Sequence, residues 1–272
     1  MTTPAVRICL LIPHYEHSDA IGSLLRRLEP HGLPCVLVDD GSSEHARRIL
    51  RALAQQHAWV DIVWRETNGG QGAAKRSGYH HAVSRGFTHA VEIDADGQHD
   101  TDDIPLFVQA MRDNPSAVVF GEPEFGDDAP SVRVWGRQLS RGLVWLACGS
   151  MAVADPLCGY RGMPLVAALE VERTSHTGDR MTHDPEFAVR LYRAGLPILN
   201  IPTHVSYPED GVSHFDMVRD NLELAATYAR LLAELPLAAP WILLARRRAR
   251  ELEAADAAAR EQLAATPGCA GR

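Results

Sequence analysis

The chain has 272 residues, of which 46% are hydrophobic, and its formal net charge at pH 7 is −8. This acidic balance argues against a dedicated nucleic-acid-binding protein, because such proteins usually have a basic surface. The five cysteines are scattered and form no Cys-x-x-Cys pair, which argues against a zinc site or a disulfide framework and favours a reducing cytoplasm. We expect no secretory signal and no membrane span, since the longest apolar stretches fall short of the roughly 20 residues required.

Short β-branched runs alternate with helical patterns over the first 120 residues. The predicted strands are mainly apolar along their length rather than alternating between apolar and polar residues, which is typical of strands that are covered on both faces. Strands separated by helices of this length predict right-handed βαβ units and a mainly parallel sheet. The predicted strands are 7–12, 34–38, 60–64, 89–93 and 117–120, and the predicted helices are 19–28, 44–56, 71–85 and 103–112.

The second half of the chain follows a different pattern. Acidic residues with Gly and Pro predict a loop over 122–130, and an apolar stripe predicts a helix over 217–235. Further helices are predicted over 133–148 and 185–194, with a strand at 197–201. We assign residues 1–235 to one domain and 236–272 to a C-terminal helical extension.

The extension places apolar residues 241–244 directly before the arginine-rich stretch 246–250. Two interpretations stay open for it. It is either a solvated terminal helix or an interfacial segment, with its apolar residues in the lipid boundary and its arginines on anionic headgroups.

Polar and glycine-rich motifs follow four of the predicted strands, at the point where each strand ends. Ligands of an open α/β sheet bind at the carboxyl ends of its strands, so we expect these motifs to meet at one edge. The motifs are Pro-His-Tyr-Glu-His at 13–17, Asp-Asp-Gly-Ser at 39–42, Asn-Gly-Gly-Gln-Gly-Ala-Ala-Lys at 68–75 and Asp-Ala-Asp-Gly-Gln at 94–98.

The last of these motifs indicates a metal site. Asp94 and Asp96 lie two residues apart at a strand end, so their side chains point the same way. With the oxygen of Gln98 they suit Mg²⁺ or Mn²⁺ carrying a diphosphate. Acidic pairs also cap helices and fill loops, and the motif by itself leaves that alternative open.

In their order and spacing, these motifs resemble glycosyltransferase family 2, and within it the dolichyl- and polyprenyl-phosphate sugar transferases. The resemblance runs from about residue 8 to residue 215. It implies the GT-A fold, an α/β fold with a mainly parallel, Rossmann-like sheet and helices on both faces. It also implies a metal-dependent, inverting transferase that moves a sugar from a UDP- or GDP-linked donor to a lipid, either a polyprenyl phosphate or a glycolipid-type hydroxyl. Such an enzyme would be cytoplasmic, with peripheral contact at the inner face of the membrane.

The resemblance further implies roles for single residues. Pro13 and Tyr15 would border the nucleotide base, Asp40 would accept a hydrogen bond from the base or ribose, and Lys75 or nearby free amides would face phosphate. Asp94, Asp96 and Gln98 would bind the metal. The full set of implied donor-binding residues is Pro13, Tyr15, Asp39, Asp40, Gly72, Lys75, Asp94, Ala95, Asp96 and His214. For the pair Asp39–Asp40 a plain helix cap is the alternative, and for the glycine segment it is close helix–sheet packing.

Three arginines, Arg133, Arg137 and Arg141, are spaced four residues apart and would share one helix face with Ser140 between them. In the resembling enzymes, Arg and Ser in a comparable place hold the acceptor phosphate, and bidentate pairing explains the use of Arg. A solvated basic stripe is the alternative. The segment 155–162 would form part of the wall near the sugar.

Asp184 completes the implied catalytic set, with Asp96 and Arg137. For a hydroxyl acceptor Asp184 would be the general base, whereas for a phosphate acceptor it would orient the sugar. Because Pro185 follows, a simple helix start is a further interpretation of Asp184.

The sequence departs from the family pattern in three places: His17 replaces a Glu, His214 replaces a Lys, and an Arg four to six residues upstream of His214 is missing. The departures at and before His214 leave the donor and acceptor open. The substitutions at His17 and His214 also keep in view a nucleotide-sugar-binding protein without turnover. A further alternative is a nucleotidyltransferase, which also pairs a parallel sheet with metal carboxylates. Such an enzyme would need a glycine-rich, basic signature after the first strand, and residues 13–17 do not provide it.

Overall fold

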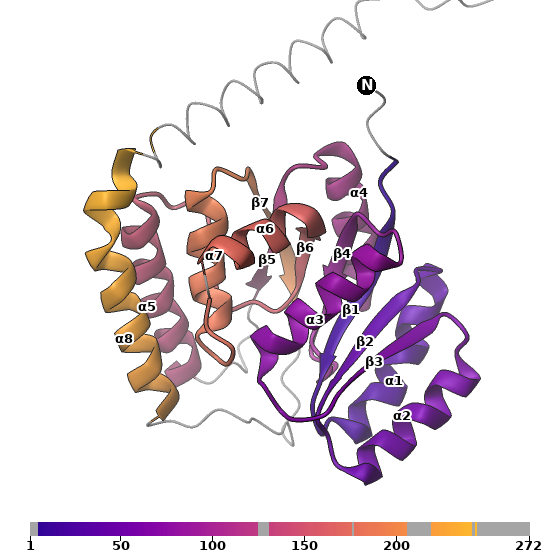
Figure 1. Ribbon diagram of the computed structural model, residues 1–272. Coiled ribbons are helices and arrows are strands. Elements are labelled where there is room, and N and C mark those ends of the chain that lie inside the picture. Colours follow the sequence, from indigo (N-terminus) through magenta and orange to yellow (C-terminus); the bar gives the residue numbers. More distant parts are fainter. Residues whose placement is uncertain (1–4, 125–130, 176, 206–218, 241–242, 244–272) are drawn as a thin grey trace, which may run out of the picture.

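A computed structural model describes residues 5–124, 131–175, 177–205, 219–240 and 243. Its strands form one seven-stranded sheet in the order β3-β2-β1-β4-β6-β5-β7 (Figure 1). Strand β6 runs antiparallel to both of its neighbours, and the other neighbouring pairs are parallel. The strands are β1 Ile8–His14, β2 Cys35–Asp40, β3 Val60–Arg65, β4 His89–Glu92, β5 Val118–Glu124, β6 Arg161–Pro164 and β7 Ile198–His204.

Helices cover both faces of this sheet, as the sequence predicts. Alternate strand residues face opposite sides, so Leu11 packs in the core under α3, α6 and α7, while Leu10 packs in the core under α1, α2 and α4. The helices are α1 Ser18–Leu28, α2 Glu44–Gln56, α3 Gln71–Ser84, α4 Ile104–Asp113, α5 Ser131–Cys148, α6 Leu165–Ser175, α7 His183–Arg193 and α8 Arg219–Ala233, with short 3-10 turns η1 Glu29–His31 and η2 Thr101–Asp103.

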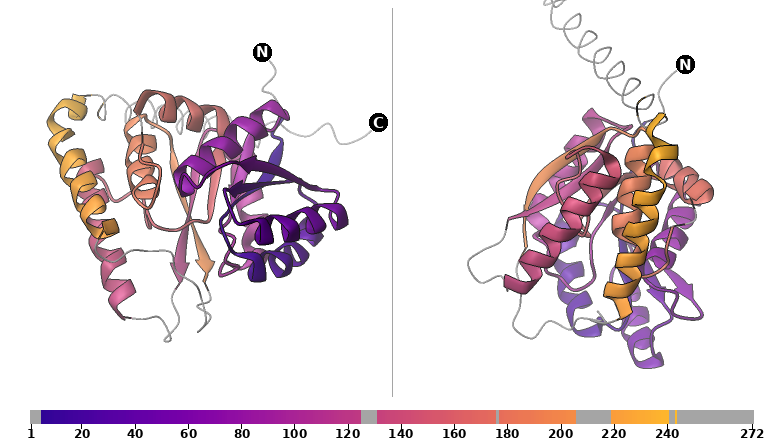
Figure 2. Two further views of the ribbon diagram at one scale, coloured as in Figure 1. Left: turned by 60° about the horizontal axis from the view of Figure 1, so that its bottom comes forward. Right: turned by 90° about the vertical axis from the view of Figure 1, so that its left-hand side faces the viewer.

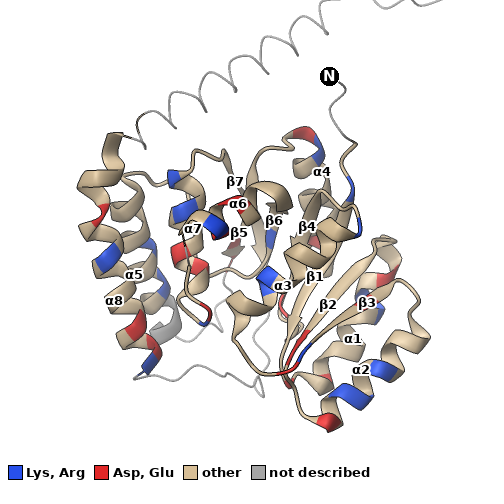
Figure 3. Cartoon of the chain, in the orientation of Figure 1, with Lys and Arg blue, Asp and Glu red and all other residues tan. Residues whose placement is uncertain are grey.

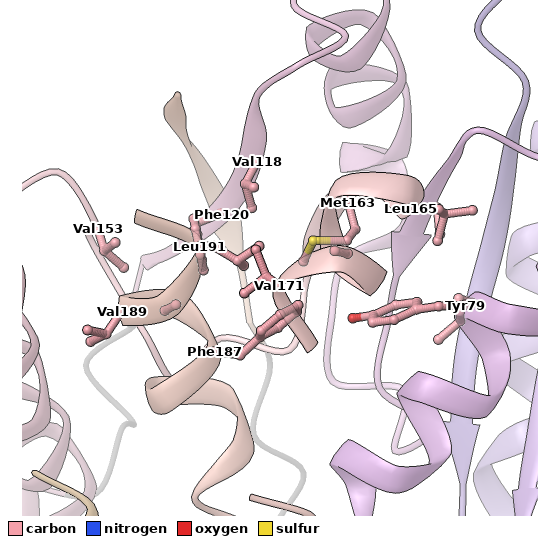
Figure 4. Close-up of a cluster of buried hydrophobic side chains, with 14 of the residues drawn as sticks. Tyr79, Val118, Phe120, Val153, Met163, Leu165, Val171, Phe187, Val189 and Leu191 are labelled. Atoms are coloured by element: carbon pink, nitrogen blue, oxygen red, sulfur yellow. The ribbon is translucent and has the colours of Figure 1, made fainter. Parts of the chain in front are cut away.

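The core on the α3 side continues beyond the sheet toward α5 and α8. Tyr79, Met163 and Phe187 lie between the helices and the strands (Figure 4) and are all fully buried. Burial of each such side chain stabilises the fold by roughly 2 kcal/mol. Helix α8 packs on α5 and α7 rather than on the sheet, so α5 and α8 lie side by side at one end of the molecule (Figure 2).

The element predictions agree with the structure except over residues 161–175. The six predicted strands and seven predicted helices are present with small shifts at their ends. Strand β6 and helix α6 were not predicted, and β6 is the reason that the sheet is mixed. Its four residues are Arg-Gly-Met-Pro, with no β-branched residue among them, so they lack the pattern that predicts the other strands. The boundary at residue 235 stays a prediction, because most of the extension lies outside the described residues.

The topology brings the sequence motifs to one edge. Strands β1, β2, β3 and β4 are parallel and adjacent, and their register places His14 beside Asp39 and Asp40 beside Arg65. Charged residues gather at the lower ends of β1 and β2 in the view of Figure 3. The carboxyl ends of these strands are therefore the place to look for a ligand site.

Candidate active site

The acidic motif after β4 forms a turn at this edge. The Nε2 of Gln71, at the start of α3, donates to Asp94 Oδ1 over 3.0 Å, and His99 Nε2 lies 3.4 Å from Asp94 Oδ2. The backbone N–H of Gln98 donates to Asp96 Oδ1 over 3.0 Å. Both carboxylates are thus held in place and remain partly exposed. Ala95, between them, is buried and packs with the core.

The two carboxylates have opposite pKa shifts. Burial would raise the pKa of Asp94, but the hydrogen bond and charge of His99 and the charge of Lys75 outweigh it, so the pKa is lowered. Burial and the negative charge of Asp94 raise the pKa of Asp96. Two mutually repelling carboxylates at one strand end are stabilised by a divalent cation, so this donor set fits Mg²⁺ or Mn²⁺.

Within the part of the chain that the structure describes, Asp94 and Asp96 are not joined by a larger set of metal-binding side chains. Among the described residues, no group of three or more His, Cys, Asp and Glu side chains is placed to hold a metal ion. The candidate set is therefore two carboxylates and the amide oxygen of Gln98. Few protein ligands are typical of a hard cation whose remaining coordination positions are filled by phosphate and water oxygens.

A backbone segment that leads into β6 packs directly behind Asp94. A Cβ atom added to Gly159 would lie 2.5 Å from Asp94 Oδ1, and closer still to Oδ2 and Cγ. A side chain at this position would therefore displace the carboxylate. The segment 155–162, expected near the sugar, thus forms the wall behind the acidic motif.

Asp40 is buried and is paired within the protein. It is 2% exposed, and its carboxylate accepts hydrogen bonds from Gly70 N at 2.7 Å, Gly69 N at 3.1 Å and Arg65 Nε at 2.6 Å. These bonds fix the loop after β3. Asp40 therefore shapes the loop, and a direct bond from it to the base or ribose stays a prediction.

Asp39 is also paired within the protein. Its Oδ2 accepts a hydrogen bond from Arg47 Nε over 2.8 Å. Burial would raise the pKa of Asp39, but hydrogen bonds from His14, Ser42 and Arg47 outweigh it and lower the pKa. Pro13 and Tyr15, at the end of β1, are partly exposed next to this pair.

Glu16, which follows Tyr15, is paired with the residue before α2. Its carboxylate accepts hydrogen bonds from the backbone N–H and, over 3.0 Å, from the hydroxyl of Ser43 at the start of α2. It joins the loop after β1 to the loop after β2.

Lys75 does not face a phosphate site, contrary to the expectation. Its side chain is 0% exposed, and its Nζ donates to Asp184 Oδ1 over 2.8 Å and lies 3.2 Å from Glu92 Oε2. The amides expected to be free are also engaged, since Gly72 N and Ala73 N donate to the Asp179 carbonyl over 2.8 and 3.3 Å. Gly72 serves close packing, because a Cβ at this position would lie 2.5 Å from His183.

Asp184 lies at the centre of a buried charge network. Arg161, which is 0% exposed, donates to the same Oδ1 over 3.2 Å, and His183 Nδ1 lies 3.2 Å away. Burial would raise the pKa of Asp184, but the charges of Arg161 and Lys75 and the hydrogen bond of His183 hold it well below its usual range. Asp184 is therefore ionised at neutral pH and is a weak base.

Sequence reasoning missed most partners in this network. Glu92, His183 and Glu172 received no role, although His183 Nε2 lies 2.7 Å from Glu172 Oε1. Arg161 was expected only as part of the wall segment 155–162. A signal was present in Glu92, which interrupts an apolar strand. A buried charge of this kind requires a partner of opposite charge, so Glu92 predicts a buried cation nearby.

Two of the three arginines on α5 line a cavity. Arg137 and Arg141 face it together with Glu122, Gln138 and Asp155. Arg137 Nη1 donates to Asp155 Oδ2 over 2.7 Å. The Arg141 guanidinium stacks 4.5 Å from the centre of the Trp145 ring, and its Nε is buried without a hydrogen-bond partner in the described part of the chain.

Several predicted residues cannot be placed. His214 and its segment 211–215, the side chain of Arg133, loop residues 125–130 and residues 244–250 of the tail lie outside the described residues. Where helices are described, none is both long and apolar enough to cross a membrane.

Comparison with known proteins identifies the family. The sequence profile described as glycosyl transferase family 2 matches residues 9–158. A UDP-N-acetylglucosamine–dolichyl-phosphate N-acetylglucosaminyltransferase of Methanococcus voltae is 26% identical over 74% of this chain and 86% of its own. An undecaprenyl-phosphate 4-deoxy-4-formamido-L-arabinose transferase of Edwardsiella ictaluri is 34% identical over 78% of this chain and 64% of its own.

Solved structures show the same fold. A Pyrobaculum calidifontis mannosyltransferase in complex with GDP-Man and Mn²⁺ is 17% identical, with a TM-score of 0.55 over 96% of this chain and 81% of its own. Glucosyl-3-phosphoglycerate synthase of Mycobacterium tuberculosis is 15% identical, with a TM-score of 0.58 over 86% of this chain and 79% of its own. These likenesses confirm the expected GT-A architecture. The chain is a glycosyltransferase that belongs to glycosyl transferase family 2, with polyprenyl-phosphate sugar transferases among its relatives.

Proposed function

We propose that this enzyme transfers a sugar, with inversion and with a divalent metal, from a nucleoside diphosphate to a polyprenyl phosphate. The observation that carries the proposal is the acidic motif at the end of β4. Asp94 is fixed by Gln71 and His99 and is backed by Gly159, and Asp96 lies beside it. Support for the donor comes from the related structures, which contain GDP-Man or UDP-glucose with Mn²⁺.

Asp94, Asp96 and Gln98 would hold Mg²⁺ or Mn²⁺. When bound, this cation would neutralise the negative charge that develops on the departing nucleoside diphosphate. The chain itself keeps the two carboxylates in place. The side chain of Gln71 donates a hydrogen bond to Asp94, and the backbone N–H of Gln98 donates one to Asp96.

The state of Asp184 supports a phosphate acceptor over a hydroxyl acceptor. A hydroxyl is activated best by a base whose pKa is near the working pH, and the charges of Arg161 and Lys75 hold the pKa of Asp184 well below its usual range. A phosphate monoester dianion is already a nucleophile and needs no base. Asp184 then serves as an ionised acceptor for a sugar hydroxyl, and orients the donor.

The cavity on α5 provides a place for the acceptor phosphate. Arg137 and Arg141 both line it, and the Nε of Arg141 is buried with no hydrogen-bond partner among the described residues. Guanidinium groups match phosphate oxygens in bidentate geometry. The pairing of Arg137 with Asp155 fixes one guanidinium before the phosphate binds.

Helix α5, which lines this cavity, and its neighbour α8 also present apolar side chains to solvent. On α5, Trp135 is 76%, Leu139 67% and Leu146 61% exposed, and Leu222 on α8 is 67% exposed. Helices α5 and α8 are neighbours (Figure 2). We place this face against the inner surface of the cytoplasmic membrane, where a lipid acceptor is found, as a peripheral contact.

Nucleotide release tests the proposed reaction. Purified enzyme is incubated with UDP- and GDP-sugars, undecaprenyl phosphate and Mn²⁺ or Mg²⁺, and free nucleotide and labelled lipid are measured. Release should require the metal and the lipid phosphate, and Asp96→Asn should abolish it. The matched control is Asp102→Asn, which removes an exposed carboxylate from the same segment and should leave the rate unchanged.

Each contrary result has a defined meaning. Full activity of Asp96→Asn would refute the site. Transfer to a hydroxyl acceptor but not to undecaprenyl phosphate would refute the acceptor class. Donor binding without release under any condition would favour the binding-protein interpretation.

Flotation with anionic vesicles tests the membrane face. Leu139→Ser should reduce the bound fraction, whereas Leu106→Ser should not, because Leu106 is 52% exposed on α4, which covers the other face of the sheet. Equal flotation of both variants would refute the proposed orientation.

A further inference from the structure

Lys75 is a buried cation for which the proposed reaction has no direct use. Its side chain is 0% exposed and follows three small residues, Gly72, Ala73 and Ala74, in the first turn of α3. The ammonium lies 2.8 Å from Asp184 Oδ1 and 3.2 Å from Glu92 Oε2. Burial would lower the pKa of Lys75, but the charges of Asp184 and Glu92 outweigh it and raise the pKa, so the group stays charged.

Asp184 is held from one side only. Every hydrogen bond that the described residues make with its carboxylate ends on Oδ1, from Lys75, Arg161 and His183. The side chain is 10% exposed. The carboxylate is thus fixed in rotation, and its second oxygen, Oδ2, is left for a ligand.

The network balances its charges around this arrangement. The network contains two fully buried cations, Lys75 and Arg161, and two acids, Glu92 and Asp184. Lys75 pairs with both acids, whereas Arg161 pairs with Asp184 and is acted on by the charge of Glu92. Tyr79, also buried, donates its hydroxyl to Glu92. Removing one member would leave an unpaired buried charge, which is strongly unfavourable.

We infer that Lys75 is a positioning residue of the transfer reaction and acts through Asp184. By fixing Oδ1, it keeps Oδ2 aimed as a charged acceptor for a hydroxyl of the donor sugar. The inference rests on the proposed function, because it needs Asp184 to contact the donor. Lys75 itself touches neither the donor nor the metal.

Asp184 lies close enough to the acidic motif for its bond with Lys75 to affect the rate of transfer. The charges of Lys75 and Asp184 both act on Asp94, so the network adjoins the acidic motif. A misplacement of about 1 Å in a group that orients a substrate lowers the rate by about 100-fold. The titratable and charged groups around Asp184 come from four elements. They are Lys75 and Tyr79 of α3, Glu92 at the end of β4, Asp94 after β4, Arg161 of β6 and His183 of α7.

A double-mutant cycle tests the inference. We compare the wild type, Lys75→Met, Asp184→Asn and the double variant, with undecaprenyl phosphate, Mn²⁺ and the UDP- or GDP-sugar that the wild type turns over. Lys75→Met should lower kcat by about 100-fold and change the donor KM by less than about threefold. In the Asp184→Asn background the same change should lower kcat by less than about threefold, because its target is already lost.

Controls separate this role from simple stabilisation. Arg85→Met removes an exposed cation from the other end of α3 and should leave kcat unchanged. If Lys75→Met does not fold, Lys75→Met with Glu92→Gln removes one buried charge of each sign and replaces it in the cycle. Melting curves establish that each variant is folded before its kinetics are compared.

The outcomes distinguish the inference from the proposed function. If the wild type transfers sugar and the two effects on kcat multiply, Lys75 does not act through Asp184 and the inference is overturned. If the wild type transfers no sugar, the proposed function fails. The cycle is then measured by urea unfolding, where the absence of coupling between Lys75 and Asp184 would overturn the pairing itself.

Discussion

Replacing Gly159 with alanine places a methyl group against the candidate metal site. The added Cβ would lie 2.5 Å from Asp94 Oδ1 and closer to Oδ2 and Cγ, so the carboxylate has to withdraw by about 1 Å. Asp94 has little freedom to do so without breaking its bonds to Gln71 and His99. The distances that metal ligation requires tolerate only about 0.2 Å.

We therefore expect Gly159→Ala to fold but to lose metal-dependent turnover by about 100-fold. Metal affinity, measured by calorimetry with Mn²⁺ and UDP, should fall in parallel, and the thermal midpoint should move much less. The matched control is Gly22→Ala in α1, where an added Cβ meets Leu53 at an ordinary 3.6 Å. Wild-type turnover and Mn²⁺ affinity in Gly159→Ala would refute the placement of Asp94 at the metal.

Three further predictions concern stability, and urea unfolding measures each of them. Ser43→Ala should lower the unfolding free energy by about 1 kcal/mol, because Ser43 caps α2 through a bond from Ala46 N; no change would refute the cap. Leu25→Ala should cost about 3 kcal/mol, since this side chain is 0% exposed; a loss below 1 kcal/mol would contradict its place in the core. The folded pKa of Asp39 is lowered, so its contribution is present above its unfolded pKa near 4 and is lost as pH falls through the folded value. Asp39→Asn should therefore destabilise more at pH 7 than at pH 3, and an equal effect at both would refute the assignment.

Local sequence patterns were sufficient for most of the fold. Continuous apolar runs fix where the parallel strands lie, and the motifs after them share one edge because parallel strands end together. Strand β6 escaped this logic, since its four residues have no strand pattern and pair only because β4 and β5 flank them. Its antiparallel direction follows from tertiary pairing.

The candidate site divides in the same way. Asp94, Asp96 and Gln98 are adjacent in sequence, so their grouping is local and readable without a structure. Lys75 and Asp184 are 109 positions apart, and no local pattern could show that the lysine expected at a phosphate lies in the core against that acid. Gly159 carries no signal of its own, because its role consists of the absence of a side chain behind Asp94.

The sequence by itself determined the order of the strands and helices other than β6 and α6, the edge at which ligands bind and the acidic motif there. Tertiary structure alone decided which charges are buried together and which atoms of Asp184 remain for a ligand. The physical reason is that backbone periodicity and motif spacing act over a few residues. Burial, and with it the pairing of charges, is set by contacts between segments that are distant along the chain.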